Sequence, residues 1–226
     1  MKKALDIILT ILLGIAIFVF IITLSIGLPI YCREFYYMQI ESLSIPQKTG
    51  LTIEQIKEGY NQVLDYLVLP NATFSAGAFK YSLEGASHFA DCKGLFLLNG
   101  YALIISLIII VAISLLNKFK VVSICKPFGM SVAFISSLSI FALAIILGII
   151  VSIDFDSAFT VFHHIFFPGK DNWQFNPYTD QIILALPQQF FMNCAILIGA
   201  SIVLISLTII IVQLIKRKNN KENIEE

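Results

Sequence analysis

The sequence predicts an all-α membrane protein with four transmembrane helices, both termini cytoplasmic, and two extracellular loops that contain short interfacial helices. Three observations carry this prediction. Apolar residues make up 58% of the 226 residues and the formal net charge is zero, a composition that ordinary soluble domains do not have. Four apolar stretches are long enough to cross a bilayer, which takes roughly 20 residues each. Basic residues gather in the short segments beside these stretches, as the positive-inside rule describes.

The four stretches define the expected organisation of the chain. The spans are expected at about 5–30, 95–116, 131–153 and 191–215, with outer loops at 31–94 and 154–190. Together they are expected to form a single integral membrane domain, residues 1–226. A cleavable signal peptide is the alternative for the first span, but its apolar run of about 27 residues exceeds the usual 7–15. Tyr31, just before Cys32, also replaces the small residue that cleavage requires. We therefore expect an uncleaved span.

Basic side chains orient the chain across the membrane. The short segments carry Lys2, Lys3, Lys118, Lys120, Lys126, Lys216, Arg217, Lys218 and Lys221. Such segments face the cytoplasm, so both termini and the 117–130 loop are expected inside and the two long loops outside. The spans contain no Lys, Arg, Glu or His apart from these flanks. An ion or proton pathway, which needs ionisable residues at mid-depth, is therefore not expected.

The first outer loop is predicted to contain an amphipathic helix. Thr52 and Gln55 form a capping box that starts it, and Pro70 ends it. Apolar residues then follow with helical spacing at Ile53, Ile56, Tyr60, Val63 and Leu67. Such a helix either lies on the membrane surface or packs on the helix bundle, and no catalytic part is expected for it.

A first cluster of histidine and aspartate precedes the second span. Ser87 is expected to cap a helix that runs directly into this span. His88 and Asp91 then lie one turn apart on one helix face, so the carboxylate can accept a hydrogen bond from one imidazole nitrogen. His88 is expected roughly 10 Å above the apolar core, at the depth of the lipid headgroups.

A second cluster opens the outer loop 154–190. His163 follows Asp156 by seven positions, which places both on one helix face. The side chains of His163 and its neighbour His164 diverge by about 100° on a helix, so only one is expected to point into a site. Pro168–Gly169 ends this helix, and Trp173 suits a membrane interface. Two such clusters on one face favour a shared site near His88 over the alternative of polar residues that merely lie at a polar depth.

Metal and redox sites are not expected. Three histidines and several aspartates are present, but zinc-binding HExxH and paired CxxC spacings are absent. No cofactor is expected. Cys32 and Cys92 both lie in outer segments, so a disulfide and two free thiols both stay open.

Three stretches of this sequence resemble a family of bacterial four-helix membrane proteins, the lipoprotein intramolecular transacylases. They are SHFADCK at 87–93, DFDSAFTVFHHIFFPGKDNWQFNPYTDQII at 154–183 and LPQQFF at 186–191. The similarity covers nearly the whole chain, and its most specific part has the form F-D-x-x-F-x-x-F-H-x-x-F-F…W-x-F-x-P-x-x-D. One histidine from each cluster matches the family pattern, His88 and His163, whereas His164 occupies a variable position.

The resemblance implies a substrate and a reaction. A diacylated lipoprotein in a bacterial cell membrane would be the partner, together with membrane lipid, and no nucleic acid is expected. The enzyme would move the sn-2 acyl chain to the α-amino group of the lipoprotein's own N-terminal cysteine, giving the lyso-form. Ester and amine both belong to the substrate, so the enzyme needs no nucleophile. The alternatives are an outer-face lipid or peptide hydrolase and a non-enzymatic four-helix scaffold.

The chemistry of this reaction suggests a role for each histidine. An imidazole with a pKa near 6.5 is matched to an α-amine with a pKa of about 7.7–8.0. We expect His88 to be the general base, oriented by Asp91, and His163 the acid or oxyanion donor, supported by Asp156; the reverse order stays open. Substrate contacts are expected from Trp173, Phe167, Asp171 and Asp180.

Overall fold

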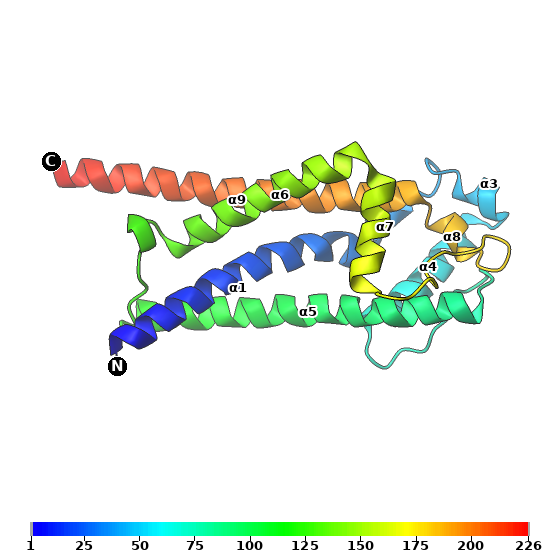
Figure 1. Ribbon diagram of the computed structural model, residues 1–226, viewed down its shortest axis with the longest axis horizontal. Coiled ribbons are helices and arrows are strands. Elements are labelled where there is room, and N and C mark those ends of the chain that lie inside the picture. Colours follow the sequence, from blue (N-terminus) through cyan, green and yellow to red (C-terminus); the bar gives the residue numbers. More distant parts are fainter. Residues whose placement is uncertain (1, 226) are drawn as a thin grey trace. The chain divides into compact units, whose positions relative to one another are not determined.

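The described chain is entirely helical in its regular structure. The computed structural model describes residues 2–225, with side chains for residues 2–219, so the side chain of Lys221 lies outside the described part. Within this range no strand occurs, as the sequence predicts (Figure 1). Four helices are long and apolar enough to cross a membrane: α1 (Lys2–Tyr31), α5 (Leu83–Lys118), α6 (Val132–Ile153) and α9 (Gln188–Glu225). The chain is thus a multi-pass membrane protein.

Shorter helices occupy the connections. They are α2 (Arg33–Tyr37), α3 (Ile45–Thr49), α4 (Ile53–Val68), η1 (Pro127–Gly129), α7 (Phe155–Phe166) and α8 (Ile182–Ala185). The chain divides into two compact units. The first unit comprises Met1–Ser25, Tyr101–Ile149 and Gly199–Glu226, and the second unit comprises Ile26–Gly100 and Ile150–Ile198. All three histidines belong to the second unit. That residues 1–226 form a single domain stays a prediction.

The first unit is held by an apolar cluster and a few polar contacts from α1. Leu13, Ile113 and Val132 are buried together. Ser136 Oγ in α6 donates to the Gly14 carbonyl at 2.8 Å, which satisfies a hydroxyl that would otherwise be costly in an apolar surrounding. These contacts pack helices and carry no chemistry.

The second unit is built around α4, whose predicted ends are confirmed. Thr52 Oγ1 accepts from the Gln55 backbone N–H at 3.3 Å, and Gln55 Oε1 accepts from the Thr52 N–H at 3.0 Å. The helix ends at Val68, just before Pro70. Its apolar face is buried, so α4 packs on its neighbours through the side chains that helical spacing predicted.

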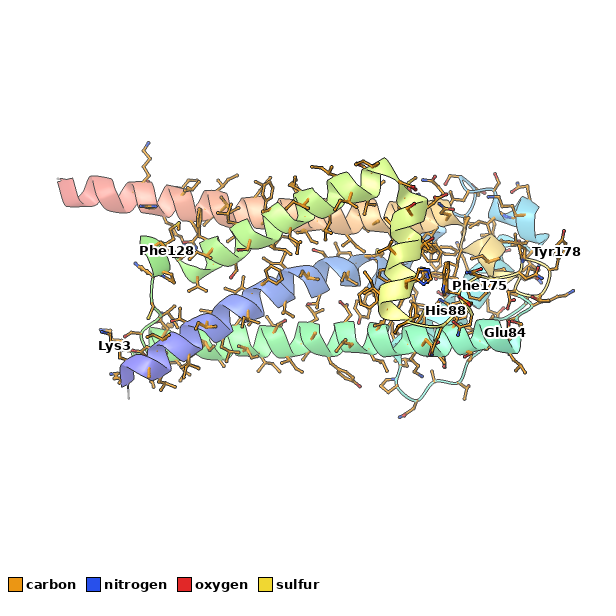
Figure 2. The ribbon with its side chains drawn as sticks, viewed as in Figure 1. Lys3, Glu84, His88, Phe128, Phe175 and Tyr178 are labelled. Atoms are coloured by element: carbon orange, nitrogen blue, oxygen red, sulfur yellow. The ribbon has the colours of Figure 1, made fainter. Side chains whose placement is uncertain are left out.

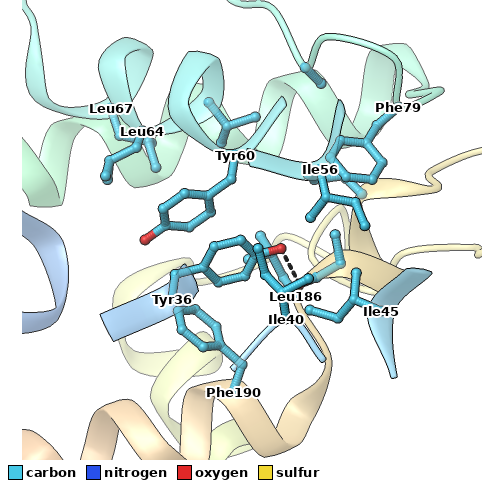
Figure 3. Close-up of a cluster of buried hydrophobic side chains, with 14 of the residues drawn as sticks. Tyr36, Ile40, Ile45, Ile56, Tyr60, Leu64, Leu67, Phe79, Leu186 and Phe190 are labelled. Carbon is cyan, nitrogen blue, oxygen red and sulfur yellow. Dashed lines mark hydrogen bonds between the residues drawn. The ribbon is translucent and has the colours of Figure 1, made fainter. Parts of the chain in front are cut away.

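Two stacked tyrosines mark the centre of this packing. The rings of Tyr36 and Tyr60 lie 3.8 Å apart between centroids, and Phe190 meets Tyr36 edge-on (Figure 3). Tyr36 Oη donates to the Ala185 carbonyl at 2.9 Å, which ties α2 to α8 (Figure 3). Burial raises the pKa of both tyrosines far above its ordinary value, so both stay neutral.

The start of α5 differs from the prediction. The helix begins at Leu83, so Ser87 lies inside it and the expectation that Ser87 caps it is wrong. Asp180 Oδ1 accepts from both the backbone N–H and the hydroxyl of Ser82, each at 2.8 Å, and Ser82 Oγ accepts from the Gly85 N–H. A distant carboxylate therefore allows the helix to begin one turn earlier. A Cβ at Gly85 would lie 2.2 Å from Asp180 Oδ1, so only glycine permits this approach.

The second outer loop follows the predicted pattern more closely. Asp154 accepts from the Ser157 N–H at the start of α7, and α7 ends at Phe166, before Pro168. All four cysteines are free, so Cys32 and Cys92 are not joined in a disulfide.

Candidate active site

The second unit contains a cavity of about 350 Å³, and α1, α4, α5, α7, α8, α9 and the segment after α7 all contribute to its walls. Nearly all of the lining is apolar; its polar side chains come from His88, His163, Tyr60, Trp173, Cys92 and Cys194. On α5 the lining positions run from His88 to Phe96, and on α9 from Phe190 to Ile198. At 1.5 Å per residue, each wall is about 12 Å long. The cavity therefore extends from the histidines along the apolar helices.

Two histidines from different helices meet at this cavity. His88 on α5 and His163 on α7 are 5% and 6% exposed, and their ring centroids lie 5.8 Å apart. The two clusters that are far apart in the sequence do come together, as expected. His164, the next residue along α7, is exposed, because adjacent helical side chains point in different directions.

The surroundings of His163 fix its tautomer. Its Nδ1 donates to the Phe159 carbonyl, one turn earlier in α7, at 2.7 Å. A carbonyl can only accept, so the hydrogen is on Nδ1 and the Nε2 of the neutral ring has a free lone pair. Burial lowers the pKa of His163 from its ordinary 6.5; the Phe159 carbonyl opposes this shift, and nearby His164 adds to it. His163 is therefore neutral at pH 7, with Nε2 able to take a proton.

His88 is enclosed by aromatic rings and one thiol. Its ring meets Phe167 at 5.0 Å and Phe175 at 5.5 Å between centroids. His88 and Phe175 are labelled near each other in Figure 2. Its Nε2 lies 3.3 Å from the Sγ of Cys92, which also lines the cavity. Its Nδ1 is buried and has no hydrogen-bond partner. An unpartnered polar atom at this depth disfavours the charged ring.

Asp91 does not contact His88 as the sequence suggested. Its carboxylate forms an ion pair with Lys170 and accepts from Asn172 Nδ2 at 3.1 Å. The reason is electrostatic, because a cation and an amide donor from the second outer loop are better partners for a carboxylate than a neutral ring. Sequence reasoning missed Lys170 and Asn172. The polar K-D-N-W run directly after the break of α7 is the signal that could have identified them.

The other expected residues divide into two groups. Phe167 and Trp173 line the cavity, as do Phe159 and Phe162. The three remaining aspartates lie outside its lining. Asp156 is exposed and accepts a hydrogen bond from Gln188 rather than from His163. Asp171 is exposed. Asp180 caps α5, and both of its carboxylate oxygens accept hydrogen bonds. Tyr60 and Phe175 reach the cavity without having been expected there.

The chemistry available here is proton transfer beside an apolar pocket. Among the described residues, no group of three or more His, Cys, Asp or Glu side chains is arranged to hold a metal ion. Two neutral imidazoles face a cavity of the shape and polarity that suit a lipid chain. That combination suits an acyl-transfer reaction on a lipid ester.

A family model described as lipoprotein intramolecular transacylase Lit matches residues 11–191. This chain belongs to the lipoprotein intramolecular transacylase family. The transacylase is therefore an acyltransferase of the membrane, and the resemblance noted in the sequence is confirmed. No curated protein sequence matches it significantly.

Solved structures of the membrane integral lipoprotein intramolecular transacylase Lit from Bacillus cereus share the fold of this transacylase. One has a TM-score of 0.85 and 25% sequence identity, and covers 99% of this chain and 100% of that chain. Two further structures are variants of that protein in which a histidine is replaced by arginine or by alanine. Each has a TM-score of 0.78 and 24% identity, covering 98% of this chain and 96% or 97% of that chain.

Proposed function

We propose that this transacylase moves the sn-2 acyl chain of a diacylglyceryl-modified lipoprotein to the α-amino group of the lipoprotein's own N-terminal cysteine. The observation that carries the proposal is the pair of buried imidazoles, 5.8 Å apart, beside an apolar cavity. The ester and the amine both come from the substrate, so acid/base groups and a lipid-shaped pocket are what the reaction requires. Histidine variants among the solved Bacillus cereus structures are consistent with a role for histidine.

The same proposal places the reaction at the extracellular face of a bacterial cell membrane. The basic residues of the termini and the 117–130 loop favour the cytoplasm, which leaves the loops around His88 and His163 outside. In this orientation the short helices α4 and α7 lie at the interface. The N-terminal cysteine of an exported lipoprotein reaches the site from that side.

The cavity would hold the acyl chains while the headgroup meets the imidazoles. Burying apolar surface gains roughly 25 cal/mol per Å², which can offset bending of the substrate into the reactive geometry. Phe159 and Phe162 of α7 form part of this wall next to His163. Membrane lipid and the diacylated lipoprotein are thus the partners of the site.

Two neutral histidines suit a substrate that arrives with a charged amine. An α-amine with a pKa of about 7.7–8.0 is mostly protonated at neutral pH. One imidazole takes the ammonium proton, and the freed nitrogen attacks the sn-2 carbonyl carbon. As the C–N bond forms, the second imidazole removes another proton from that nitrogen. The bond from the carbonyl carbon to the glycerol oxygen then breaks, and the first imidazole returns its proton to that oxygen. The second imidazole releases its proton to water, so both rings are neutral again.

The surroundings of the two rings support a division of these roles. His163 is the better place for a positive charge, because its ring lies on the face of Trp173 and its Nδ1–H already donates to a carbonyl. His88, among Phe167 and Phe175 and with an unpartnered Nδ1, holds a positive charge less readily, so it is protonated only briefly, as the C–N bond forms. His163 is then the acid and His88 the base. This is the order that the sequence favoured.

Fragment masses of a synthetic lipopeptide test the proposal. The lipopeptide carries two acyl chains of different length, so the position of each is read separately by tandem mass spectrometry. Transfer leaves the parent mass unchanged and puts only the sn-2 chain on the N-terminal nitrogen, and the His163→Ala variant abolishes it. Released fatty acid would identify a hydrolase instead, and an unaltered substrate with the unsubstituted enzyme would contradict the proposal.

A further inference from the structure

Two buried polar atoms near the two histidines have no hydrogen-bond partner. The Nδ1 of His88 and the Oδ1 of Asn172 are both buried, and neither has a partner at full hydrogen-bond geometry. The Asn172 amide nevertheless acts on the His88 ring as a hydrogen-bonding neighbour. A buried polar atom without a partner is destabilising. A ring nitrogen that can hold a hydrogen and a carbonyl-type oxygen that can only accept are complementary as donor and acceptor.

The far end of the Asn172 side chain determines which way its amide points. Its Nδ2 donates to Asp91 Oδ2 at 3.1 Å and to Ser87 Oγ at 3.5 Å. A carboxylate only accepts, so the NH₂ group faces Asp91, and Oδ1 is the atom left free to accept a hydrogen bond. Lys170 holds the Asp91 carboxylate in place from the other side. Lys170, Asp91 and Asn172 are thus linked in that order, and Asn172 also neighbours the His88 ring.

We propose that Asn172 is a positioning residue of this transacylase: its Oδ1 accepts the Nδ1 hydrogen of His88 and so leaves Nε2 unprotonated toward the cavity. This rests on the proposed function, in which His88 is the base. The arrangement matches that of His163, whose Nδ1 is held by the Phe159 carbonyl. Both rings then present a lone pair at Nε2. Asn172 also explains why Asp91 need not touch His88 to orient it.

Because the Asn172 amide is neutral, it can orient the His88 ring without changing the charge next to that ring. The charged and titratable groups that face this ring are Asp91 and Cys92 from α5, His163 from α7 and Lys170 from the loop. Asn172 transmits the orientation of the Asp91 carboxylate without adding a charge of its own. The Asn172→Asp variant would keep an acceptor for Nδ1 but add a negative charge, which separates the two effects.

Nitrogen NMR of the histidine rings tests the inference without any turnover. The chain has three histidines, so protein with ¹⁵N in its histidine rings gives three sets of ring signals, which His163→Gln and His164→Gln assign. In the unsubstituted enzyme and in Asn172→Asp, the neutral His88 ring is expected to carry its hydrogen on Nδ1. In Asn172→Ala, the hydrogen is expected on Nε2 instead. The matched control is Gln174→Ala, because Gln174 is exposed in the same loop and belongs neither to the cavity nor to the site. A hydrogen on Nε2 in the unsubstituted enzyme, or an unchanged tautomer in Asn172→Ala, would overturn the inference.

Kinetics supply the second readout. Asn172→Ala is expected to lower kcat by about 10–100-fold, the loss that follows when a metal-bound histidine loses its outer hydrogen-bond partner. KM is expected to change by less than about twofold, because Asn172 does not line the cavity. Asn172→Asp recovers part of kcat and moves the acid limb of the pH profile to higher pH, since a carboxylate stabilises the protonated ring. Unchanged kcat in Asn172→Ala, or equal loss in both variants with a folded protein, would contradict the inference. Absence of transfer by the unsubstituted enzyme would instead contradict the proposed function and leave the tautomer result standing.

Discussion

The imidazole of His163 stacks on the indole of Trp173, with ring centroids 4.5 Å apart and planes inclined by 27°. The indole is itself fixed, because its Nε1 donates to the Lys170 carbonyl at 3.0 Å. A residue of the loop after α7 therefore covers the ring that we expect to hold the proton. Such a contact is worth about 0.5–2 kcal/mol to a cationic ring.

Replacement of Trp173 should act on the protonated state of His163. Trp173→Leu removes the π face, so transfer is expected to slow by about 2–30-fold, while Trp173→Phe keeps a ring and loses less. Initial rates with the two-chain lipopeptide measure this order. Equal rates for the Leu and Phe variants would show that the stack has no part in catalysis.

Each histidine of the pair should be needed for transfer. His88→Ala and His163→Ala are each expected to lower the rate by about 10²–10⁴-fold, the usual contribution of one acid/base group. His164→Ala is the matched control, because His164 is exposed beside His163. Acyl transfer is measured by mass spectrometry, and folding by size-exclusion chromatography in detergent. A folded variant of either residue with more than a tenth of the original rate would refute its assignment.

The acid limb of the pH profile should respond to His164. Burial lowers the pKa of His163 from 6.5, and His164 contributes to that lowering. The neutral ring is the form that accepts the first proton, so activity persists below pH 6.5 and falls as the pH drops through the lowered pKa. His164→Gln removes the like charge, raises the pKa of His163 and should move the acid limb to higher pH. The pH profiles of kcat/KM are compared between the unsubstituted enzyme and His164→Gln with the same substrate, so the titration of the substrate amine affects both equally. Acid limbs at the same pH would argue against an effect of His164 on His163.

The close approach at Gly85 should make that position intolerant of a side chain. In Gly85→Ala the new Cβ would meet Asp180 Oδ1 at 2.2 Å, so the carboxylate must leave the Ser82 cap. A cost of about 1–3 kcal/mol is expected from such overpacking. Gly94→Ala in the same helix has nothing within 4 Å of its Cβ and serves as control. Thermal unfolding in detergent compares them, and equal midpoints would contradict the structural role of Asp180.

The far end of the cavity should set the length of the acyl chain. Ile198 lines that end on α9, so Ile198→Trp fills it and should favour short chains over long ones. Ile196→Trp adds the same bulk outside, since Ile196 is 62% exposed and does not line the cavity. Competition between lipopeptides of two chain lengths gives the ratio. The same ratio in both variants would show that the chain lies elsewhere.

Sequence alone predicted the helical class, the α4 capping box and the meeting of His88 with His163. These features follow from local patterns, namely apolar length, helical spacing and the stop at Pro168–Gly169. Each can be predicted from residues close together in the sequence or from the depth at which a residue lies in the membrane. The resemblance of the motifs to a known family supplied the reaction, which the family match confirmed.

The partners of the carboxylates could not be predicted in this way. Asp91 selects Lys170 and Asn172, and Asp180 selects Ser82, from segments far away in the sequence. Helical spacing indicates which residues share a face but not which loop folds over that face. Asp156 shows the same limit, because its helix face was predicted while its actual partner, Gln188, comes from α9.

The short segment Lys170–Trp173 contacts both helices that carry a histidine, through Asp91 on α5 and His163 on α7. The alignment of the two imidazoles thus depends on one stretch of loop as well as on the packing of membrane helices. Detachment of that stretch would therefore disturb both imidazoles at once.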